Sequence, residues 1–201
     1  SLKVKFLILL LSILFLLAAL ISIVFITYQL SDQRQALLNS ARGFTSLSVK
    51  PLASAYETYF DSGDIKMKEI TEKTLVLEKS VRSFQIIDVN AVVLYDSTTP
   101  KNYGRKITDL ETINAVNSDT HSEFKNSLGE VTVIIEPFFD DFGAHPYSFR
   151  FFLNYDSIRE SLVYTIAIVL GTSFLVAILS TLIVLFTVKL LIVSAIEKIV
   201  S

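Results

Sequence analysis

Residues 84–96 have the sequence FQIIDVNAVVLYD. Two runs rich in β-branched and aromatic residues, 84–88 and 92–96, flank the short segment Val89-Asn-Ala91. Short runs of this composition on either side of a brief turn are typical of a β-hairpin. We therefore predict two antiparallel strands joined by a tight turn.

More strands follow downstream of this hairpin. Residues 121–126 and 130–139 flank Ser127-Leu-Gly129 and predict a second hairpin. After a polar turn at 140–146, residues 147–155 predict a last strand. We expect these segments to form one antiparallel sheet of about five strands.

The segment before the first hairpin has a helical pattern. From 31 to 61 the apolar residues recur mostly at intervals of three and four, and Pro51 is expected to kink this helix or to split it in two. Asp61-Ser-Gly-Asp64 predicts a turn in which Asp64 caps a second helix that ends near Lys79.

A third, short helix is expected between the two hairpins. Thr108-Asp-Leu-Glu111 has the spacing of a capping box and opens a helix to about Val116. Strands grouped in antiparallel hairpins, with helices set to one side, predict an α+β fold.

Two stretches without a charged residue or a histidine enclose this region, Phe6–Ser31 and Ser161–Val188. They contain 26 and 28 residues, and at about 1.5 Å per helical residue each exceeds the roughly 30 Å hydrocarbon core of a bilayer. We expect two transmembrane helices.

A cleaved signal peptide is the alternative for the first stretch, but its apolar run exceeds the usual h-region of about 7–15 residues. For both stretches the alternative is a helix buried in a soluble protein, which would leave too much apolar surface uncovered on so small a domain.

The expected organisation has four parts. A cytoplasmic stub with the first transmembrane helix occupies 1–31, and an extracytoplasmic domain occupies 32–160. The second transmembrane helix follows at 161–188, and the start of a signalling helix at 189–201. Because the chain begins at Ser1 and stops within an apparent helix, we interpret it as part of a longer protein.

Charge sets the expected orientation and limits the partners. Four lysines flank the outer ends of the two stretches: Lys3, Lys5, Lys189 and Lys198. Only two arginines, Arg34 and Arg159, flank the middle domain. Because cytoplasmic segments carry the excess of positive charge, this favours both termini in the cytoplasm of a multi-pass plasma or inner membrane protein. The middle domain has 14 Lys/Arg and 19 Asp/Glu, a net charge of −5 without a basic stripe, so a nucleic acid partner is not expected.

The sequence contains no motif of a known catalytic centre. It has no Gly-x-Ser-x-Gly elbow, phosphate loop or His-Glu-x-x-His helix, so we expect no catalytic site and no cofactor in this segment. Without cysteine there is no disulfide scaffold or thiolate metal site. His121 and His145 fall in different predicted elements and are interpreted as solvated side chains. Glu136 with Asp140-Asp141 fits no calcium loop, so no metal site is expected.

The hairpin region resembles a known family. Ile86-Ile-Asp-Val-Asn-Ala-Val-Val-Leu-Tyr-Asp-Ser97, followed by Tyr103-Gly-Arg-Lys-Ile-Thr-Asp-Leu110, is similar to the extracytoplasmic single Cache domains, a PAS-like group. The later Ile135-Glu-Pro-Phe-Phe-Asp-Asp-Phe-Gly143 resembles a strand and turn of the same family. Ala91 stands where the family prefers glycine, which leaves the turn type open. The resemblance covers about 37–156 and implies a PAS-like sheet.

The C-terminal segment Lys189-Leu-Leu-Ile-Val-Ser-Ala-Ile-Glu-Lys-Ile-Val200 resembles the first helix of a HAMP linker. Ile196 and Ile199 match its apolar positions, whereas Ala195 replaces the usual proline. The two resemblances together imply the input half of a bacterial or archaeal transmembrane receptor. The effector of such receptors is most often a sensor histidine kinase, with a chemoreceptor or a nucleotide cyclase as alternatives.

The resemblance also implies where a ligand binds. In PAS-like sensors the pocket lies between one face of the sheet and the loop and helix that follow the second strand. The candidate walls are aromatic and the candidate cations lie nearby: Tyr95, Phe124, Phe138, Tyr147, Phe149, Phe151, Arg82, Arg105, Lys106 and Arg150. Because guanidinium groups bind carboxylates bidentately, small organic acids are the expected ligand class. The alternative is that the aromatics form the core and that Arg105-Lys106 lies on a solvated loop.

Signalling in such a receptor needs a mechanical connection. We expect a parallel homodimer in which the last strand passes into a helix capped by Asp156 that is continuous with the second transmembrane helix. The residues expected to transmit the signal are Asp156, Arg159, Ala195, Ile196 and Ile199. Ser173, Ala177 and Thr181 form a small-residue stripe that is either a dimer contact or ordinary membrane-helix composition. The alternative function is a membrane-anchored binding or assembly module without signalling output.

Overall fold

The computed structural model describes residues 2–60, 64–127 and 129–188. The chain forms two compact units: Ser1–Gln33 with Ile158–Ser201, and Arg34–Ser157. The predicted turn at 61–64 with its Asp64 cap, and the HAMP-like helix with Ala195, Ile196 and Ile199, lie outside the described residues and side chains.

The sheet of the Arg34–Ser157 unit is antiparallel throughout, with the strand order β2-β1-β5-β4-β3. Its strands are β1 (Val81–Asp88), β2 (Val93–Asp96), β3 (Ser122–Lys125), β4 (Val131–Phe138) and β5 (Tyr147–Leu153). All five correspond to predicted strands within a few residues. The α+β fold with a five-stranded antiparallel sheet is therefore confirmed.

The turn between β1 and β2 contains Ala91 in the left-handed region, with a φ of 61°. That conformation costs a residue with a Cβ about 1–2 kcal/mol, which is why glycine is commoner there. Burial of the Ala91 side chain and the bond from Ile107 N–H to its carbonyl, at 2.8 Å, hold the turn in place.

Helix α1 (Leu2–Tyr59) continues through Pro51, so of the two outcomes predicted at the proline, a kink or a split, the split is excluded. Proline removes one intrahelical hydrogen bond and costs about 3 kcal/mol in a helix interior. The next two residues, Leu52 and Ala53, are almost fully buried in the sheet unit. Their packing offsets the lost bond, because burying a large apolar side chain contributes about 1.5–3 kcal/mol.

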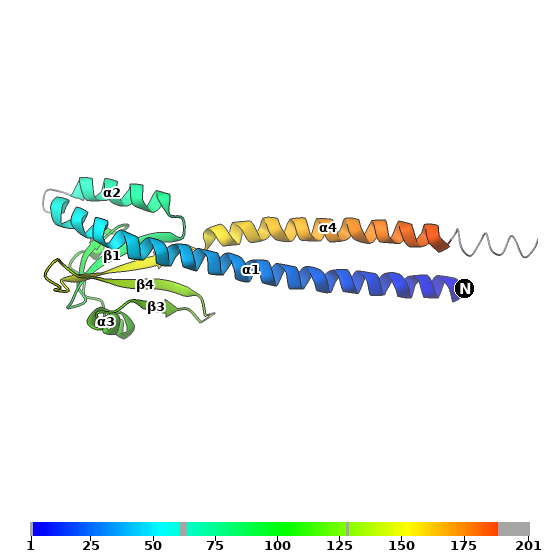
Figure 1. The fold of residues 1–201 in the computed structure, drawn as a ribbon, viewed down its shortest axis with the longest axis horizontal. Coiled ribbons are helices and arrows are strands. Elements are labelled where there is room, and N and C mark those ends of the chain that lie inside the picture. Colours follow the sequence, from blue (N-terminus) through cyan, green and yellow to red (C-terminus); the bar gives the residue numbers. More distant parts are fainter. Residues whose placement is uncertain (1, 61–63, 128, 189–201) are drawn as a thin grey trace, which may run out of the picture. The chain divides into compact units, whose positions relative to one another are not determined.

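Helices cover both faces of the sheet (Figure 1). The α1 residues from 34 onward and α2 (Asp64–Leu77) pack on one face, and α3 (Leu110–Asn117) packs on the other. On the α1 face the Phe44 ring lies 6.2 Å from the Phe151 ring, centroid to centroid. On the α3 face Val116 packs with Ile87 and Ala91.

The N-cap of α3 is Asp109 rather than Thr108, which corrects the predicted capping box by one residue. Asp109 Oδ1 accepts a hydrogen bond from Glu111 N–H at 3.2 Å, and its Oδ2 accepts one from the Thr112 hydroxyl at 2.7 Å. A carboxylate is a stronger cap than a hydroxyl at the positive end of the helix dipole.

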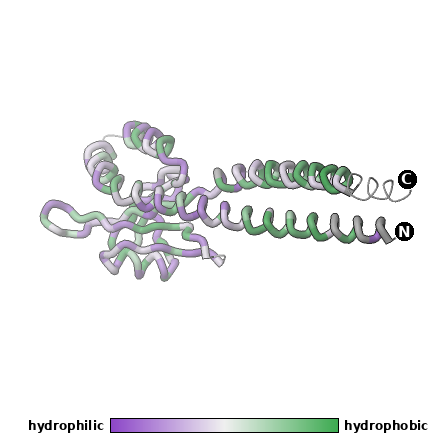
Figure 2. The backbone as a smooth tube through the Cα atoms, turned by 45° about the vertical axis from the view of Figure 1, so that its right-hand side comes forward, coloured by the Kyte–Doolittle hydropathy of each residue, from purple (hydrophilic) through white to green (hydrophobic). Residues whose placement is uncertain are grey.

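The other unit contains the N-terminal part of α1 and most of α4 (Asp156–Val188). Ser12–Tyr59 and Ile158–Thr187 are two helices long and apolar enough to cross a membrane, and only 6% of the most apolar window of each is buried. Figure 2 shows the hydrophobic colouring along α4 and along the N-terminal part of α1. Within the unit, Ser22 Oγ and Ser173 Oγ hydrogen-bond at 2.7 Å, so Ser173 of the small-residue stripe contacts α1 of the same chain.

Candidate functional site: a polar row beneath α3

A row of polar side chains crosses the sheet face that α3 covers. Gln85 of β1 pairs with Asp96 of β2 on one side and with Arg150 of β5 on the other. Directly paired residues of antiparallel strands lie on the same face, and apolar residues such as Ile87 and Ile135 also occupy this face. The row therefore places an acid, an amide and a guanidinium side by side on the face that α3 covers.

Asp96 anchors the loop that follows β2. Its carboxylate is buried and accepts hydrogen bonds from the backbone N–H groups of Thr98 and Thr99 at 2.9 Å and from the amides of Gln85 and Asn102 at 2.7 Å. Burial raises the pKa of Asp96, but these hydrogen bonds outweigh it and the net pKa is lowered. All of its bonds are internal, so Asp96 positions the loop.

Arg150, unlike Asp96, is incompletely hydrogen-bonded within the described structure. Its side chain is 18% exposed, its Nε is buried without a hydrogen-bond partner among the described residues, and the nearest carboxylate, Asp109, lies 3.8 Å from Nη2. The guanidinium carbon lies 5.0 Å from the centroid of the Phe152 ring. Burial lowers the pKa of Arg150, and the charge of Asp109 offsets this only in part.

This arrangement suits an anionic ligand. A guanidinium has five N–H donors, and a planar carboxylate can accept two of them in parallel. The buried Gln85 Oε1 also lacks a hydrogen-bond partner among the described residues, so it is an available acceptor beside the cation. Leaving a buried polar atom unpaired costs about 1–3 kcal/mol, which a bound carboxylate with a neighbouring donor could recover.

Most of the aromatic residues predicted to line a ligand pocket lie on the face of the sheet opposite to α3. They therefore do not surround Arg150. These residues pack beneath α1 and α2: Tyr95, Phe138, Tyr147, Phe149 and Phe151. The Tyr147 hydroxyl donates to Glu57 Oε1 of α1 at 2.7 Å, and the Tyr95 hydroxyl hydrogen-bonds the Thr71 hydroxyl of α2 at 3.1 Å. These aromatics form the core, as the stated alternative predicted.

The strand register also decides on which face of the sheet the other predicted ligand-site residues lie. Phe124 packs on the α3 face with Ala115 and Val133. Arg150, which is adjacent in sequence to two of the core phenylalanines, points to the α3 face because successive strand residues alternate between faces. Arg82, Arg105 and Lys106 are exposed. Arg150 is therefore the one predicted cation that the described structure holds half-buried on this face.

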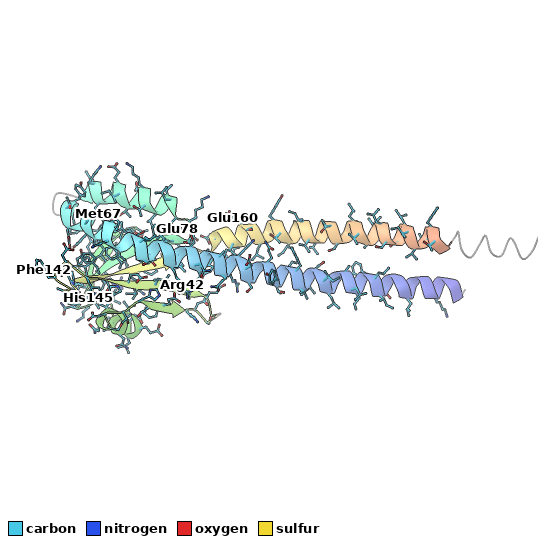
Figure 3. The ribbon with its side chains drawn as sticks, in the orientation of Figure 1. Arg42, Met67, Glu78, Phe142, His145 and Glu160 are labelled. Carbon is cyan, nitrogen blue, oxygen red and sulfur yellow. The ribbon has the colours of Figure 1, made fainter. Side chains whose placement is uncertain are left out.

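Sequence reasoning missed a hydrogen-bond chain at the loop between β4 and β5, where Figure 3 labels His145. His145 Nδ1 contacts Asp119 Oδ1, and its Nε2 lies 2.8 Å from Ser148 Oγ. The His145 side chain is 7% exposed, so the prediction of a solvated histidine is wrong. The order Asp–His–Ser is that of a hydrolase triad, but Ser148 is fully buried and its hydroxyl cannot reach a substrate. The chain ties the β4–β5 loop to the segment after α3.

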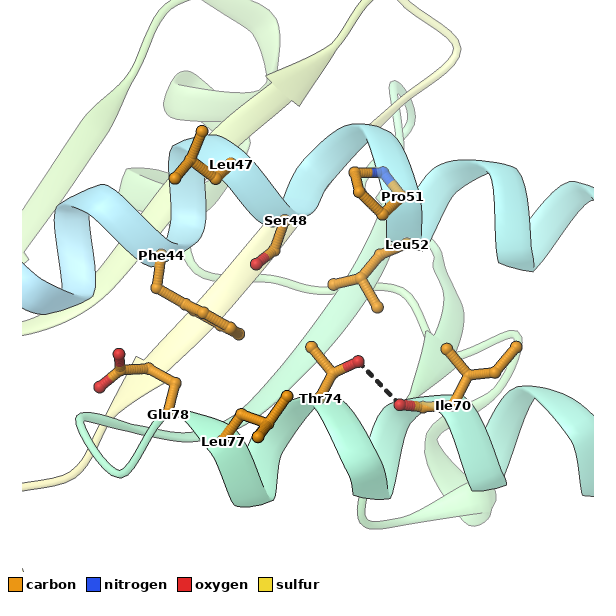
Figure 4. Close-up of a pocket in the computed structure, with 9 residues that line it drawn as sticks. All are labelled: Phe44, Leu47, Ser48, Pro51, Leu52, Ile70, Thr74, Leu77 and Glu78. Atoms are coloured by element: carbon orange, nitrogen blue, oxygen red, sulfur yellow. Dashed lines mark hydrogen bonds between the residues drawn. The ribbon is translucent and has the colours of Figure 1, made fainter.

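A groove of about 350 Å³ lies between α1 and α2 (Figure 4), and Arg150 is not among the residues that line it. Leu47 and Leu77 at its margin are 78% and 85% exposed. Its lining is mostly apolar: Phe44, Leu47, Ser48, Pro51, Leu52, Ile70, Thr74, Leu77 and Glu78.

At the start of α4, Asn154 Oδ1 accepts a hydrogen bond from Asp156 N–H at 3.0 Å. The capping side chain is thus Asn154, whereas Asp156 is the first helical residue, a correction of its predicted cap role. Asn154 N–H also donates to Ser80 O at 2.8 Å, so the helix start is tied to the beginning of β1. Arg159 is exposed.

No family model and no curated protein matches this sequence. Among solved structures, an extracellular ligand-binding receptor from Desulfohalobium retbaense DSM5692 aligns with a TM-score of 0.51 and 15% identity, over 70% of this chain and 26% of the receptor. This chain therefore corresponds to about a quarter of that receptor's length.

Two sensor domains align more loosely. The E. coli DcuS sensor domain has a TM-score of 0.45 and 13% identity, over 67% of this chain and 97% of DcuS. The Vibrio cholerae LuxQ periplasmic domain has a TM-score of 0.44 and 13% identity, over 73% of this chain and 69% of the LuxQ domain. At these identities the likeness concerns the fold alone. The fold is α+β and PAS-like, as predicted.

Proposed function

We propose that this chain is the input half of a transmembrane signalling receptor. Residues 34–157 would detect an extracytoplasmic stimulus, and α4 would pass the change to a cytoplasmic effector, for which we favour a histidine kinase. The observation that carries this proposal is the chain order. A sheet unit with the fold of an extracellular receptor domain is bounded in sequence by two helices long and apolar enough to cross a membrane.

The proposal includes a topology and an assembly. Both termini lie in the cytoplasm, the sheet unit lies outside the plasma or inner membrane, and two copies associate in parallel. A single chain that crosses a membrane twice can signal by small piston, tilt or rotation steps of its helices, which a dimer interface with two packing states would amplify.

The ligand we propose is a small organic acid, held on the α3 face by Arg150. The support is the half-buried guanidinium with an unbonded Nε beside the unbonded Gln85 Oε1. Neither a cofactor nor a metal ion takes part in this proposal.

Cysteine labelling tests the topology, because the natural chain contains no cysteine. In intact cells a membrane-impermeant maleimide should label Lys125→Cys on the exposed part of β3, and should label Lys5→Cys only after lysis. Protection of Lys125→Cys in intact cells would overturn the receptor proposal. Labelling as expected, with no change in output of the full-length protein under any stimulus, would favour the anchored binding module instead.

Thermal unfolding of the purified chain in detergent tests the ligand class, with acetate, succinate and L-malate as probes. We expect at least one of them to raise the melting temperature of the wild type and of Arg105→Gln, but not that of Arg150→Gln. If none does so, the organic acid proposal is wrong and the topology proposal is unaffected.

A further inference from the structure

His121, which directly precedes β3, lies between two carboxylates. Its Nδ1 is 2.8 Å from Glu136 Oε1, and its Nε2 is 3.2 Å from Glu123 Oε1. The Glu123 and Glu136 side chains are only 15% and 13% exposed, whereas the imidazole is 43% exposed. A histidine that solvent reaches therefore connects two largely buried acids on neighbouring strands, rather than being solvated alone as the sequence predicted.

Both carboxylates also bind helix α1, on which Figure 3 labels Arg42. Arg42 donates two hydrogen bonds to Glu123, from Nε at 2.6 Å and from Nη2 at 2.9 Å. The hydroxyl of the fully buried Thr45 donates to Glu136 Oε1 at 3.2 Å. These five residues, which we call the His121 clasp, join α1 to β3 and β4.

The clasp geometry requires a proton on each ring nitrogen. A neutral imidazole has one N–H, so it can donate to only one of the two acids, and its other nitrogen would present a lone pair to a carboxylate oxygen. The charged groups that face His121 in the described structure are Glu136 from β4 and Glu123 from β3, with Arg42 of α1 behind Glu123. With His121 protonated, the two cations balance the two anions. Without that proton, a largely buried negative charge is left uncompensated, which is costly.

Electrostatics agree with this geometry. Burial lowers the pKa of His121, but the hydrogen bonds and charges of Glu136 and Glu123 outweigh it and raise the pKa above its ordinary value. Stability from a group with a raised pKa is fully present below the unfolded pKa and is lost as the pH rises through the folded pKa. While both carboxylates are ionised, the clasp is therefore present below the ordinary histidine pKa of 6.5 and is lost as the pH rises through the raised pKa of His121.

We propose that His121 is a proton-operated clasp that holds α1 against β3 and β4 when it is protonated and loosens this contact when it is neutral. Because α1 is the helix that contains the first apolar stretch, external acidity becomes an input of the receptor. That last step rests on the proposed function, whereas the clasp itself does not.

The proposal is tested on the full chain in detergent. The chain contains only two histidines, so their imidazole signals can be told apart with a single variant. Imidazole NMR signals of a histidine-labelled sample, assigned with His145→Gln, give the His121 pKa directly. We expect it above the ordinary value of 6.5 and lowered in Glu136→Gln. A value at or below 6.5 overturns the proposal.

A second measurement follows the motion. Spin labels at Ser46→Cys on α1 and Lys125→Cys on β3, both exposed sites, report the distance between the two elements. We expect the distance distribution to broaden between pH 5.5 and pH 8.5, and this change to be retained in His145→Gln and lost completely in His121→Gln. An identical distribution at both pH values overturns the clasp. If the distance depends on pH as expected but Lys125→Cys is not labelled in intact cells, the receptor proposal is rejected and the clasp is retained.

Discussion

Gln85 and Arg150 are direct cross-strand partners on β1 and β5, and each has a buried polar atom that bonds no described residue. Adjacent unsatisfied groups of this kind are uncommon inside a folded domain, because each costs about 1–3 kcal/mol. Here one is a donor, Arg150 Nε, and the other is an acceptor, Gln85 Oε1. This pair is the site at which we propose that an organic acid binds.

Removing the charge at this position should therefore stabilise the ligand-free protein. Arg150→Met keeps the aliphatic contact with Phe152 and removes the buried guanidinium, so we expect the free energy of unfolding to rise by about 1 kcal/mol. Thermal or denaturant unfolding of the full chain in detergent measures this change. The control Arg105→Met, at an exposed position, should stay within about 0.5 kcal/mol. A loss of stability in Arg150→Met would mean that its attraction to Asp109 outweighs the unbonded Nε.

The aromatic layer beneath α1 should carry much of the domain's stability. Phe151→Ala empties a fully buried site that contacts Phe44 and Phe84, and we expect a loss of about 3–5 kcal/mol in the free energy of unfolding. Phe142→Ala is the matched control, because that ring is 97% exposed in the β4–β5 loop, and its effect should stay below about 0.5 kcal/mol. Similar melting temperatures for the two variants would contradict this description of the core.

Asp96 should make the fold sensitive to strong acid. Since its folded pKa is lowered, its contribution to stability is present above its unfolded pKa, near 3.8, and is lost as the pH falls through the folded pKa. Asp96→Asn should cost about 1–3 kcal/mol at neutral pH and flatten the stability profile below pH of about 4. Unfolding curves between pH 2.5 and 7 measure both effects. Asp141→Asn, at an exposed position, should reproduce the wild-type profile; if Asp96→Asn does so too, the Asp96 carboxylate does not hold the loop.

Signal transfer through α4 should depend on helical phase. One alanine inserted after Arg159 rotates the following helix by about 100° relative to the sheet unit, whereas seven inserted residues complete nearly two turns. If the full-length protein signals as we propose, an output reporter should show that the single insertion changes signalling strongly and that the seven-residue insertion restores much of it. Unchanged output from the single insertion would exclude a rigid α4 connection.

The strands and the helices were predictable because they depend on local pattern. The β-branched and aromatic runs in 84–96 form the first hairpin, and the charge-free stretches form long exposed helices. The capping of α3 was displaced by one residue, because Asp109 and Thr108 are both acceptable caps and only the backbone geometry selects between them. Pro51 predicts a kink or a split, and the sequence does not show that the helix continues, because the cost of proline is local while the compensating burial of Leu52 is tertiary.

The sequence by itself determined the α+β class, the five antiparallel strands and the two apolar helices, because hydrophobic periodicity and length are properties of consecutive residues. Only the tertiary structure decided that Phe149 and Phe151 face α1 while Arg150 faces α3. It also decided that His121 lies between Glu123 and Glu136, and that His145 joins Asp119 to Ser148. Strand alternation fixes which residues share a face, but which helix covers that face depends on how distant segments pack.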